Sequence, residues 1–143
     1  MNYHLTIRGY RKGLNMVLSG FHYDMRTRRF FNPIKEENDK ICIWAIRQHK
    51  TLRNTQITKP IVLHYKFYWH DRKSDRMNLF SAFDKSFEDA LQKTGVIKND
   101  GWNDVINATQ DFDIDKNDPR VEVIIEELDS PIYNVFNWKS LGL

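Results

Sequence analysis

Residues 72–102 read RKSDRMNLFSAFDKSFEDALQKTGVIKNDGW, and this stretch decides the fold. Its apolar side chains recur at steps of three and four residues, which is the spacing of a helix that packs one face on a core. They are Leu79, Phe80, Phe83, Phe87, Ala90 and Leu91. Gly95 follows them and is expected to end the helix. The stretch therefore predicts an amphipathic helix over residues 79–91.

Polar residues of the same stretch gather on a second face of that helix. At about 100° per residue, one narrow stripe lies away from the phenylalanines and holds Asn78, Ala82, Lys85 and Asp89. Asp75 precedes the helix and Asp100 lies in the turn that follows it, so both can fold back towards the stripe. Asp84 and Glu88 are close in sequence, but the helical wheel turns them away from the stripe. The arrangement predicts a group of carboxylates beside one amine.

Such a group has a chemical use and an ordinary explanation. Clustered carboxylates repel one another, and Mg²⁺ relieves the repulsion while keeping waters and bridging to phosphate. A nearby lysine then neutralises charge that develops on a phosphoryl oxygen. The ordinary explanation is that Asp75 caps the helix, Lys85 and Asp89 form an i,i+4 pair, and Asp100 forms a turn before glycine.

Several separated motifs resemble those of one nuclease family. Asp75-Arg-Met-Asn78, Lys85, Asp89-Ala-Leu and Gly95-Val-Ile-Lys-Asn-Asp100-Gly-Trp102 stand in this order. They resemble the D-x-D-N, K-x-x-x-D-A-L and G-x-x-x-N-D-G-W elements of RusA-like Holliday-junction resolvases, in the form often met in prophages. The resemblance extends more weakly to Gly13-Leu-Asn15 and to residues 115–123. It covers the chain to about Leu128 and leaves residues 129–143 as a tail.

The resemblance implies a homodimeric, Mg²⁺-dependent endodeoxyribonuclease, with Mn²⁺ as an alternative ion. Such an enzyme resolves four-way DNA junctions in recombination and repair by cutting two symmetry-related strands. Carried over by residue, Asp75, Asp89 and Asp100 match the metal carboxylates, and Asp75, Lys85 and Asp100 the catalytic positions. Asn78 matches the residue that orients a carboxylate.

One position departs from the family pattern. Met77 stands where the family has its second D-x-D carboxylate, and a thioether is a poor ligand for a hard cation. Two alternatives to an active nuclease therefore stay open. One is a catalytically weakened or inactive protein that binds four-way junctions, and the other is a structural or regulatory protein that has only inherited the fold.

Composition and pattern predict one α+β domain over residues 1–143, with a small mixed or antiparallel sheet and two main helices. Apolar residues make up 41% of the chain, which suits a globular fold. The one cysteine, Cys42, is expected in the core. The first residues lack the apolar run of a signal peptide and no segment reaches membrane-spanning length, so a cytoplasmic location is expected.

Alternation and caps place the remaining elements. Strands are expected at residues 4–8, 60–69, 105–112 and 120–128, with a hairpin connection between the last two. A second helix is expected over residues 34–49, with a core stripe that includes Cys42, Trp44, Ala45 and Ile46. His64 and His70 are interpreted as surface or core histidines because neither has a second histidine at ligand spacing.

Charge is divided unevenly along the chain. Residues 1–74 hold 15 Lys and Arg against 5 Asp and Glu, a net +10, whereas residues 75–143 hold 7 against 14, a net −7. Basic residues near the start alternate with aromatic ones, which suits a surface that grips phosphates and stacks bases, although a solvated loop looks similar. The predicted DNA-binding residues are Arg11, Lys12, Arg26, Arg28, Arg29, Arg72, Lys73 and Arg76.

Overall fold

The computed structural model describes residues 1–9, 22–133 and 138–142. A four-stranded sheet runs in the order β1 (Asn2–Ile7), β6 (Arg120–Glu127), β4 (Ile61–Trp69) and β5 (Val105–Ile114). Two α-helices of the described residues, α2 (Pro33–Gln48) and α3 (Arg76–Lys93), accompany it. The smaller elements are a hairpin of β2 (His22–Asp24) and β3 (Arg29–Phe31) and the 3₁₀ turns η1 (Leu52–Asn54) and η2 (Trp138–Leu141). These elements confirm a small α+β domain with a mixed sheet.

The sheet is mixed because β4 pairs in parallel with β5 and antiparallel with β6. The parallel pairing needs a crossover, which α3 supplies. The predicted hairpin connection between residues 105–112 and 120–128 is wrong, since β4 lies between these two strands. The loop after β5 instead passes the end of β4, where the Asp115 N–H donates to the Trp69 carbonyl at 2.8 Å.

Helix α3 is the predicted amphipathic helix, longer by three residues at its start and two at its end than residues 79–91. Phe83 and Phe87 are fully buried, and the Phe83 ring meets Tyr65 and Phe67 of β4 edge-on at 5.1 and 5.6 Å between centroids. Aromatic side chains therefore carry much of the contact between helix and sheet. Gly95 follows with φ of +78°, the left-handed conformation that confirms it as the helix terminator.

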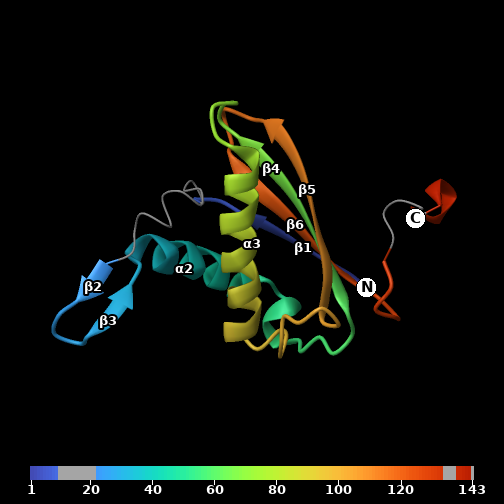
Figure 1. Ribbon diagram of the computed structural model, residues 1–143, viewed down its shortest axis with the longest axis horizontal. Helices are drawn as coiled ribbons and strands as arrows, with labels where there is room; N and C mark the ends of the chain where they lie inside the picture. Colours follow the sequence, from blue (N-terminus) through green and yellow to red (C-terminus); the bar gives the residue numbers. More distant parts are fainter. Residues whose placement is uncertain (10–21, 134–137, 143) are drawn as a thin grey trace.

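Helix α2 lies beside α3 on the same side of the sheet (Figure 1). Cys42 and Ile46 are fully buried, as predicted, but Trp44 is 66% exposed, so its predicted place in the core stripe is wrong. Trp44 stands two residues from each of them, a rotation of about 200° around the helix, which turns it to solvent. No described helix is long and apolar enough to cross a bilayer.

The β2–β3 hairpin projects from the body of the molecule at the outer end of α2 (Figure 1). Arg26 and Arg28 in its turn and Arg29 at the start of β3 are exposed, and Arg28 has φ of +54°. This basic segment is therefore a strand-turn-strand unit rather than a plain loop. Arg11 and Lys12, also predicted to bind DNA, lie outside the described residues.

Candidate functional site

The first turn of α3 is organised by Asp75. One carboxylate oxygen of Asp75 accepts from the N–H groups of Met77 and Asn78 at 2.9 and 3.2 Å, so Asp75 is the N-cap of the helix. The side chain is exposed, which leaves its second oxygen accessible. Met77 is 53% exposed beside it, and Asn78 is half-buried. Of the two roles that the sequence suggests for Asp75, helix cap and metal ligand, the structure shows the cap.

Asp89 faces the other helix and is held by two lysines. Its carboxylate oxygens accept from Lys35 of α2 at 2.9 Å and from Lys85 at 3.2 Å. Lys35 also donates to Asp39 at 2.9 Å, which joins α2 to α3 through buried and half-buried charges. Desolvation opposes ionisation of Asp89, but the two lysines outweigh it and lower its pKa. Asp89 is therefore an ionised member of an ion network between the helices.

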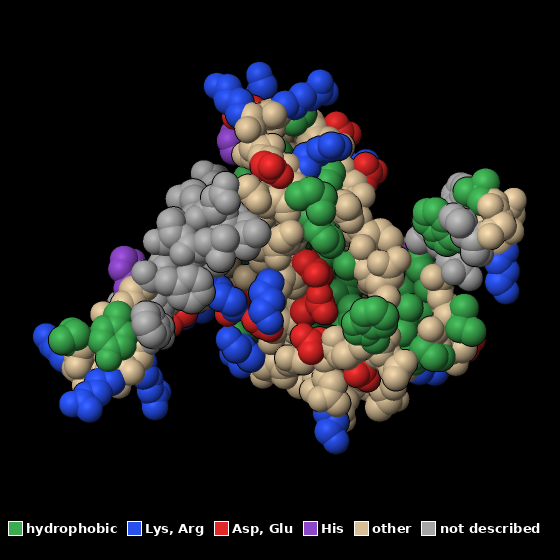
Figure 2. All heavy atoms as spheres, viewed as in Figure 1, with side chains coloured by type: hydrophobic (Ala, Val, Ile, Leu, Met, Phe, Trp, Pro, Cys, Tyr) green, Lys and Arg blue, Asp and Glu red, His purple; other side chains and the backbone are tan. Residues whose placement is uncertain are grey.

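A different set of carboxylates gathers on α3. Glu88 forms a hydrogen bond with Asp84, one turn earlier on the helix, and Asp100 in the loop after α3 is close enough to act on it electrostatically. The Tyr65 hydroxyl of β4 donates to Asp84 at 2.7 Å and holds that carboxylate in place from the sheet. We call Asp84, Glu88 and Asp100 the acidic cluster. Figure 2 shows carboxylates in a column beside α3, with Lys and Arg side chains on one side and hydrophobic side chains on the other.

Crowding in the acidic cluster changes the acidity of Glu88. Burial, the hydrogen bond to Asp84 and the negative charges of Asp84 and Asp100 together raise the pKa of Glu88 to about 9, against a lesser opposing effect of Lys85. Glu88 is thus protonated at neutral pH. The same surroundings, and burial above all, raise the pKa of the Tyr65 hydroxyl, so Tyr65 remains a hydrogen-bond donor.

The structure does not bring the predicted metal carboxylates Asp75, Asp89 and Asp100 together in one group. Glu88, near Asp100, lies thirteen residues along the helix from Asp75, or about 20 Å, so Asp75 and Asp100 do not share one site within a chain. Asp89 points to the lysines. Among the residues that the structure describes, no three His, Cys, Asp or Glu side chains form a group able to hold a metal ion. Asp100 instead acts electrostatically on Glu88, which is hydrogen-bonded to Asp84, and these two are the residues that the helical wheel turns away from the stripe.

Two groups of predicted DNA-binding residues flank the helices. Arg72, Lys73 and Arg76 are exposed at the turn that leads into α3, and Arg26, Arg28 and Arg29 are exposed on the β2–β3 hairpin. Figure 2 shows Lys and Arg side chains at both places. The guanidinium group of Arg76 lies 5.8 Å from the centre of the Phe112 ring. These exposed cations are suited to contacts with a phosphate backbone.

A groove with a volume of about 740 Å³ opens beside the first turn of α3. We call it the α3 groove. It lies between that turn and the ends of β4 and β5, and it combines aromatic, aliphatic and charged side chains. The residues that line it are Trp69, Asp71, Arg72, Ser74, Asp75, Arg76, Met77, Leu79, Phe112, Asp113 and Ile114.

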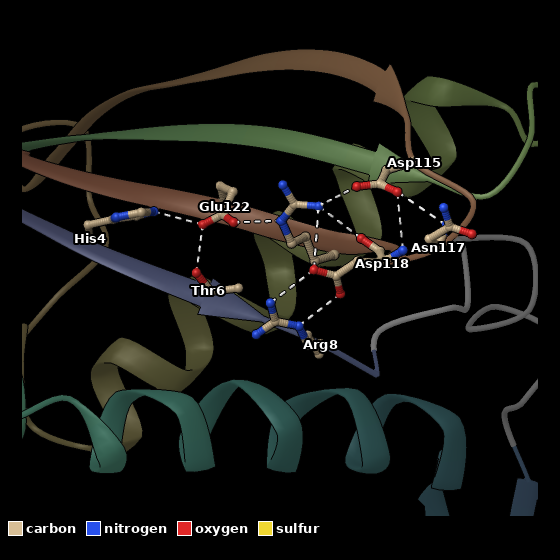
Figure 3. Close-up of polar contacts among 8 residues, drawn as sticks. His4, Thr6, Arg8, Asp115, Asn117, Asp118 and Glu122 are labelled. Atoms are coloured by element: carbon tan, nitrogen blue, oxygen red, sulfur yellow. Dashed lines mark hydrogen bonds and ion pairs between the residues drawn. The ribbon is translucent and has the colours of Figure 1, made fainter.

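The sheet face away from the helices carries a separate polar network (Figure 3). Glu122 accepts from Thr6 and Arg120 and pairs with His4, each at 2.7 Å, while Arg8 binds Asp118 through two nitrogens at 2.9 and 3.0 Å. Arg120 also reaches Asp115 at 3.0 Å, which lowers the pKa of that carboxyl. Arg8 and Arg120 are therefore already paired with carboxylates.

The two histidines singled out in the sequence have ordinary partners. His64 lies on the same sheet face and contacts Thr109 at 2.7 Å and Glu126 at 2.9 Å through its two ring nitrogens. His70 lies 3.4 Å from Asp71. Of the two alternatives, surface or core, both histidines take the first, since each side chain is partly exposed beside a carboxylate.

The site can thus be described as an acidic cluster on α3, a basic turn and groove at the start of the same helix, and a basic hairpin beyond α2. No family model and no curated protein matches this chain.

Proposed function

We propose that this chain is a Mg²⁺-dependent endodeoxyribonuclease that acts on four-way DNA junctions as a homodimer. The observation that carries the proposal is the acidic cluster, in which Tyr65 holds Asp84 beside Glu88 and burial together with Asp84 and Asp100 raises the pKa of Glu88. A divalent cation is the usual relief for such crowding. The RusA-like motifs on and around α3 add the expectation that the substrate is branched DNA.

The donor chemistry of the acidic cluster fits Mg²⁺. This ion is commonly held by one or two carboxylates, several waters and the phosphates of the substrate, so a complete protein cage is not required. Asp84 and Glu88 would hold it, with Asp100 nearby. When bound, Mg²⁺ would lower the pKa of water and balance charge on the phosphodiester.

The chain's own residues supply orientation and charge. Tyr65 holds Asp84 in place by its 2.7 Å hydrogen bond. Lys85, whose side chain is 65% exposed, stands one turn before Asp89 and three residues before Glu88, where its ammonium group can reach a phosphoryl oxygen. Arg72, Lys73 and Arg76 bind backbone phosphates at the other end of α3.

A homodimer supports paired cleavage. A four-way junction has near two-fold symmetry, and two matched cuts need two equivalent sites, which a two-fold dimer provides. The location proposed for such an enzyme is the cytoplasm, where it would meet DNA during recombination and repair.

The alternative function is a junction-binding protein without cleavage. Two observations favour it: Met77 occupies the position of a family carboxylate and is exposed, and Asp89 is neutralised by Lys35 and Lys85. Both functions share the basic surfaces, so they predict the same binding and differ only in cleavage.

The test is cleavage of a labelled synthetic four-way junction against matched duplex, with Mg²⁺ titrated. Glu88→Gln and Asp84→Asn remove charge from the acidic cluster with little change of shape, and Lys85→Ala removes the ammonium group. Asp75→Asn is the informative comparison, because asparagine caps helices as well as aspartate and only the charge is lost. Glu36→Gln, at an exposed position in the first turn of α2, serves as the control.

Paired nicks that need Mg²⁺ and disappear in Glu88→Gln and Asp84→Asn would support the proposal. Loss of cleavage in Asp75→Asn alone would place the metal at the family position instead. Binding of the junction with no cleavage at any Mg²⁺ concentration would favour the alternative function, and Met77→Asp would then be tested for rescue.

Salt dependence gives a second, independent check on the partner. If about six phosphates are neutralised, junction affinity should fall roughly a thousandfold between 50 and 200 mM salt. Replacing Arg72 and Lys73 together by alanine should reduce the slope of log affinity against log salt by about two. An affinity independent of salt would contradict phosphate binding at this turn.

A further inference from the structure

We propose that the α3 groove binds one unpaired nucleobase of the DNA strand that crosses the first turn of α3. This inference rests on the proposed DNA-binding function and adds to it a ligand subsite. The site is separate from the acidic cluster, whose first member, Asp84, lies about two turns from the start of the helix.

The shape and the surface of the groove suit a base. Its volume of about 740 Å³ lies within the roughly 300–1,000 Å³ of ordinary small-molecule sites. Met77 is 53% exposed and Phe112 is half-buried, so apolar surface faces the solvent there. A flat, partly apolar ligand would cover this surface.

Phe112 offers a fixed stacking platform. Its ring stacks on Phe67 of the neighbouring strand, with centroids 5.1 Å apart and planes 13° apart, so the core holds it in place. The guanidinium group of Arg76 lies 5.8 Å from the same ring. A base that stacked on Phe112 would displace the exposed Arg76 side chain outward, and the guanidinium group would then cover the other face of the base, the combination found in single-strand binding sites.

The polar groups of the groove fit the rest of a nucleotide. Arg72 lies on its lining and is exposed, where it can bind the phosphate that follows the base. Asp71 and Asp113 also line the groove. Each carboxylate already accepts one backbone N–H, from Lys73 and Ile114, and an ionised carboxylate has further acceptor positions. They can accept from the exocyclic amine of adenine, cytosine or guanine, which thymine lacks.

The experiment uses single-stranded hexamers of deoxyadenosine and deoxythymidine as probes, titrated into ¹⁵N-labelled protein. Amide shifts identify the binding surface, and affinities are measured by fluorescence anisotropy. Phe112→Leu removes the ring but keeps an apolar side chain against Phe67, so it is preferred to Phe112→Ala. Trp44→Ala, on the exposed side of α2, is the matched loss of an aromatic group elsewhere.

The expected result is that amides of residues 71–77 and 112–114 shift and that the deoxyadenosine hexamer binds more tightly than the deoxythymidine one. Phe112→Leu should weaken binding roughly 5- to 150-fold, while Trp44→Ala leaves it unchanged. Asp113→Asn should reduce the preference for deoxyadenosine.

Two results would overturn the inference. One is binding of the hexamers with no shift at the groove, and the other is equal affinity of Phe112→Leu and the natural protein. Junction binding and cleavage measured on the same variants separate this failure from that of the proposed function. If Phe112→Leu binds and cleaves the junction as the natural protein does, the nucleobase subsite is rejected while the proposed nuclease function stands.

Discussion

Replacing Glu88 with glutamine should change how the stability of the domain depends on pH. Glu88 has an ordinary pKa of 4.5 when unfolded and about 9 when folded. Because the folded state holds this proton more tightly, the stability that it contributes is complete below pH 4.5 and is lost as pH rises towards 9. The full shift corresponds to about 6 kcal/mol, but Glu88 is half-buried and screened by water, so we expect about 2 kcal/mol.

The assay is urea unfolding of the natural protein and of Glu88→Gln at pH 5, 7 and 9. Glutamine resembles the protonated acid and does not titrate, so the variant should lose less stability between pH 5 and pH 9, by about 2 kcal/mol. Glu36→Gln, at an exposed site, should follow the natural protein. If Glu88→Gln and the natural protein show the same loss between pH 5 and pH 9, the crowding in the acidic cluster is not as described.

Substitutions at three positions test the packing around the site. Asp75→Ala should lower the free energy of unfolding by about 1 kcal/mol through loss of the N-cap, and Asp75→Asn by only a few tenths, as measured by urea unfolding. Lys35→Met leaves Asp39 and Asp89 without their shared cation and should destabilise the domain by about 3 kcal/mol in the same assay, with Lys35→Arg much milder. Gly95→Ala puts a side chain at φ of +78° and should cost about 1 kcal/mol, seen in calorimetry as a melting temperature lower by roughly 3 °C; an unchanged melting temperature would argue against the left-handed turn.

The sequence predicted the elements whose pattern is long and regular. Helix α3 and strand β4 were both found close to their ends because a buried face must repeat at the period of its element. Residues 41–46 are all apolar and so predict a core stripe that includes Trp44, but a stripe also depends on the angle around the helix, and Trp44 lies about 200° from Cys42 and Ile46. The order of strands could not be predicted locally, since nothing in residues 115–119 tells that β4 lies between β5 and β6.

The sequence predicts the region of the candidate site, the carboxylates on and around α3, but not which residues contact each carboxylate. A helical wheel gives the direction of a side chain from its own axis, and it correctly separated Asp89 from Asp84 and Glu88. It cannot tell what the neighbouring element presents. Lys35 of α2 meets Asp89, and Tyr65 of β4 meets Asp84, through contacts between residues 54 and 19 positions apart in the chain. These two partners decide which carboxylates are ionised and paired and which are crowded.

The order of the sheet also bears on synthesis of the protein. β6, formed by residues 120–127, lies between β1, formed by residues 2–7, and β4, and it pairs with both of them. While the chain is being translated, β1 and one side of β4 therefore stay open until almost the whole sequence has left the ribosome. Unpaired strand edges are the parts of a nascent chain most prone to associate with other chains. A message truncated before β6 would thus yield an aggregating fragment rather than a smaller working domain.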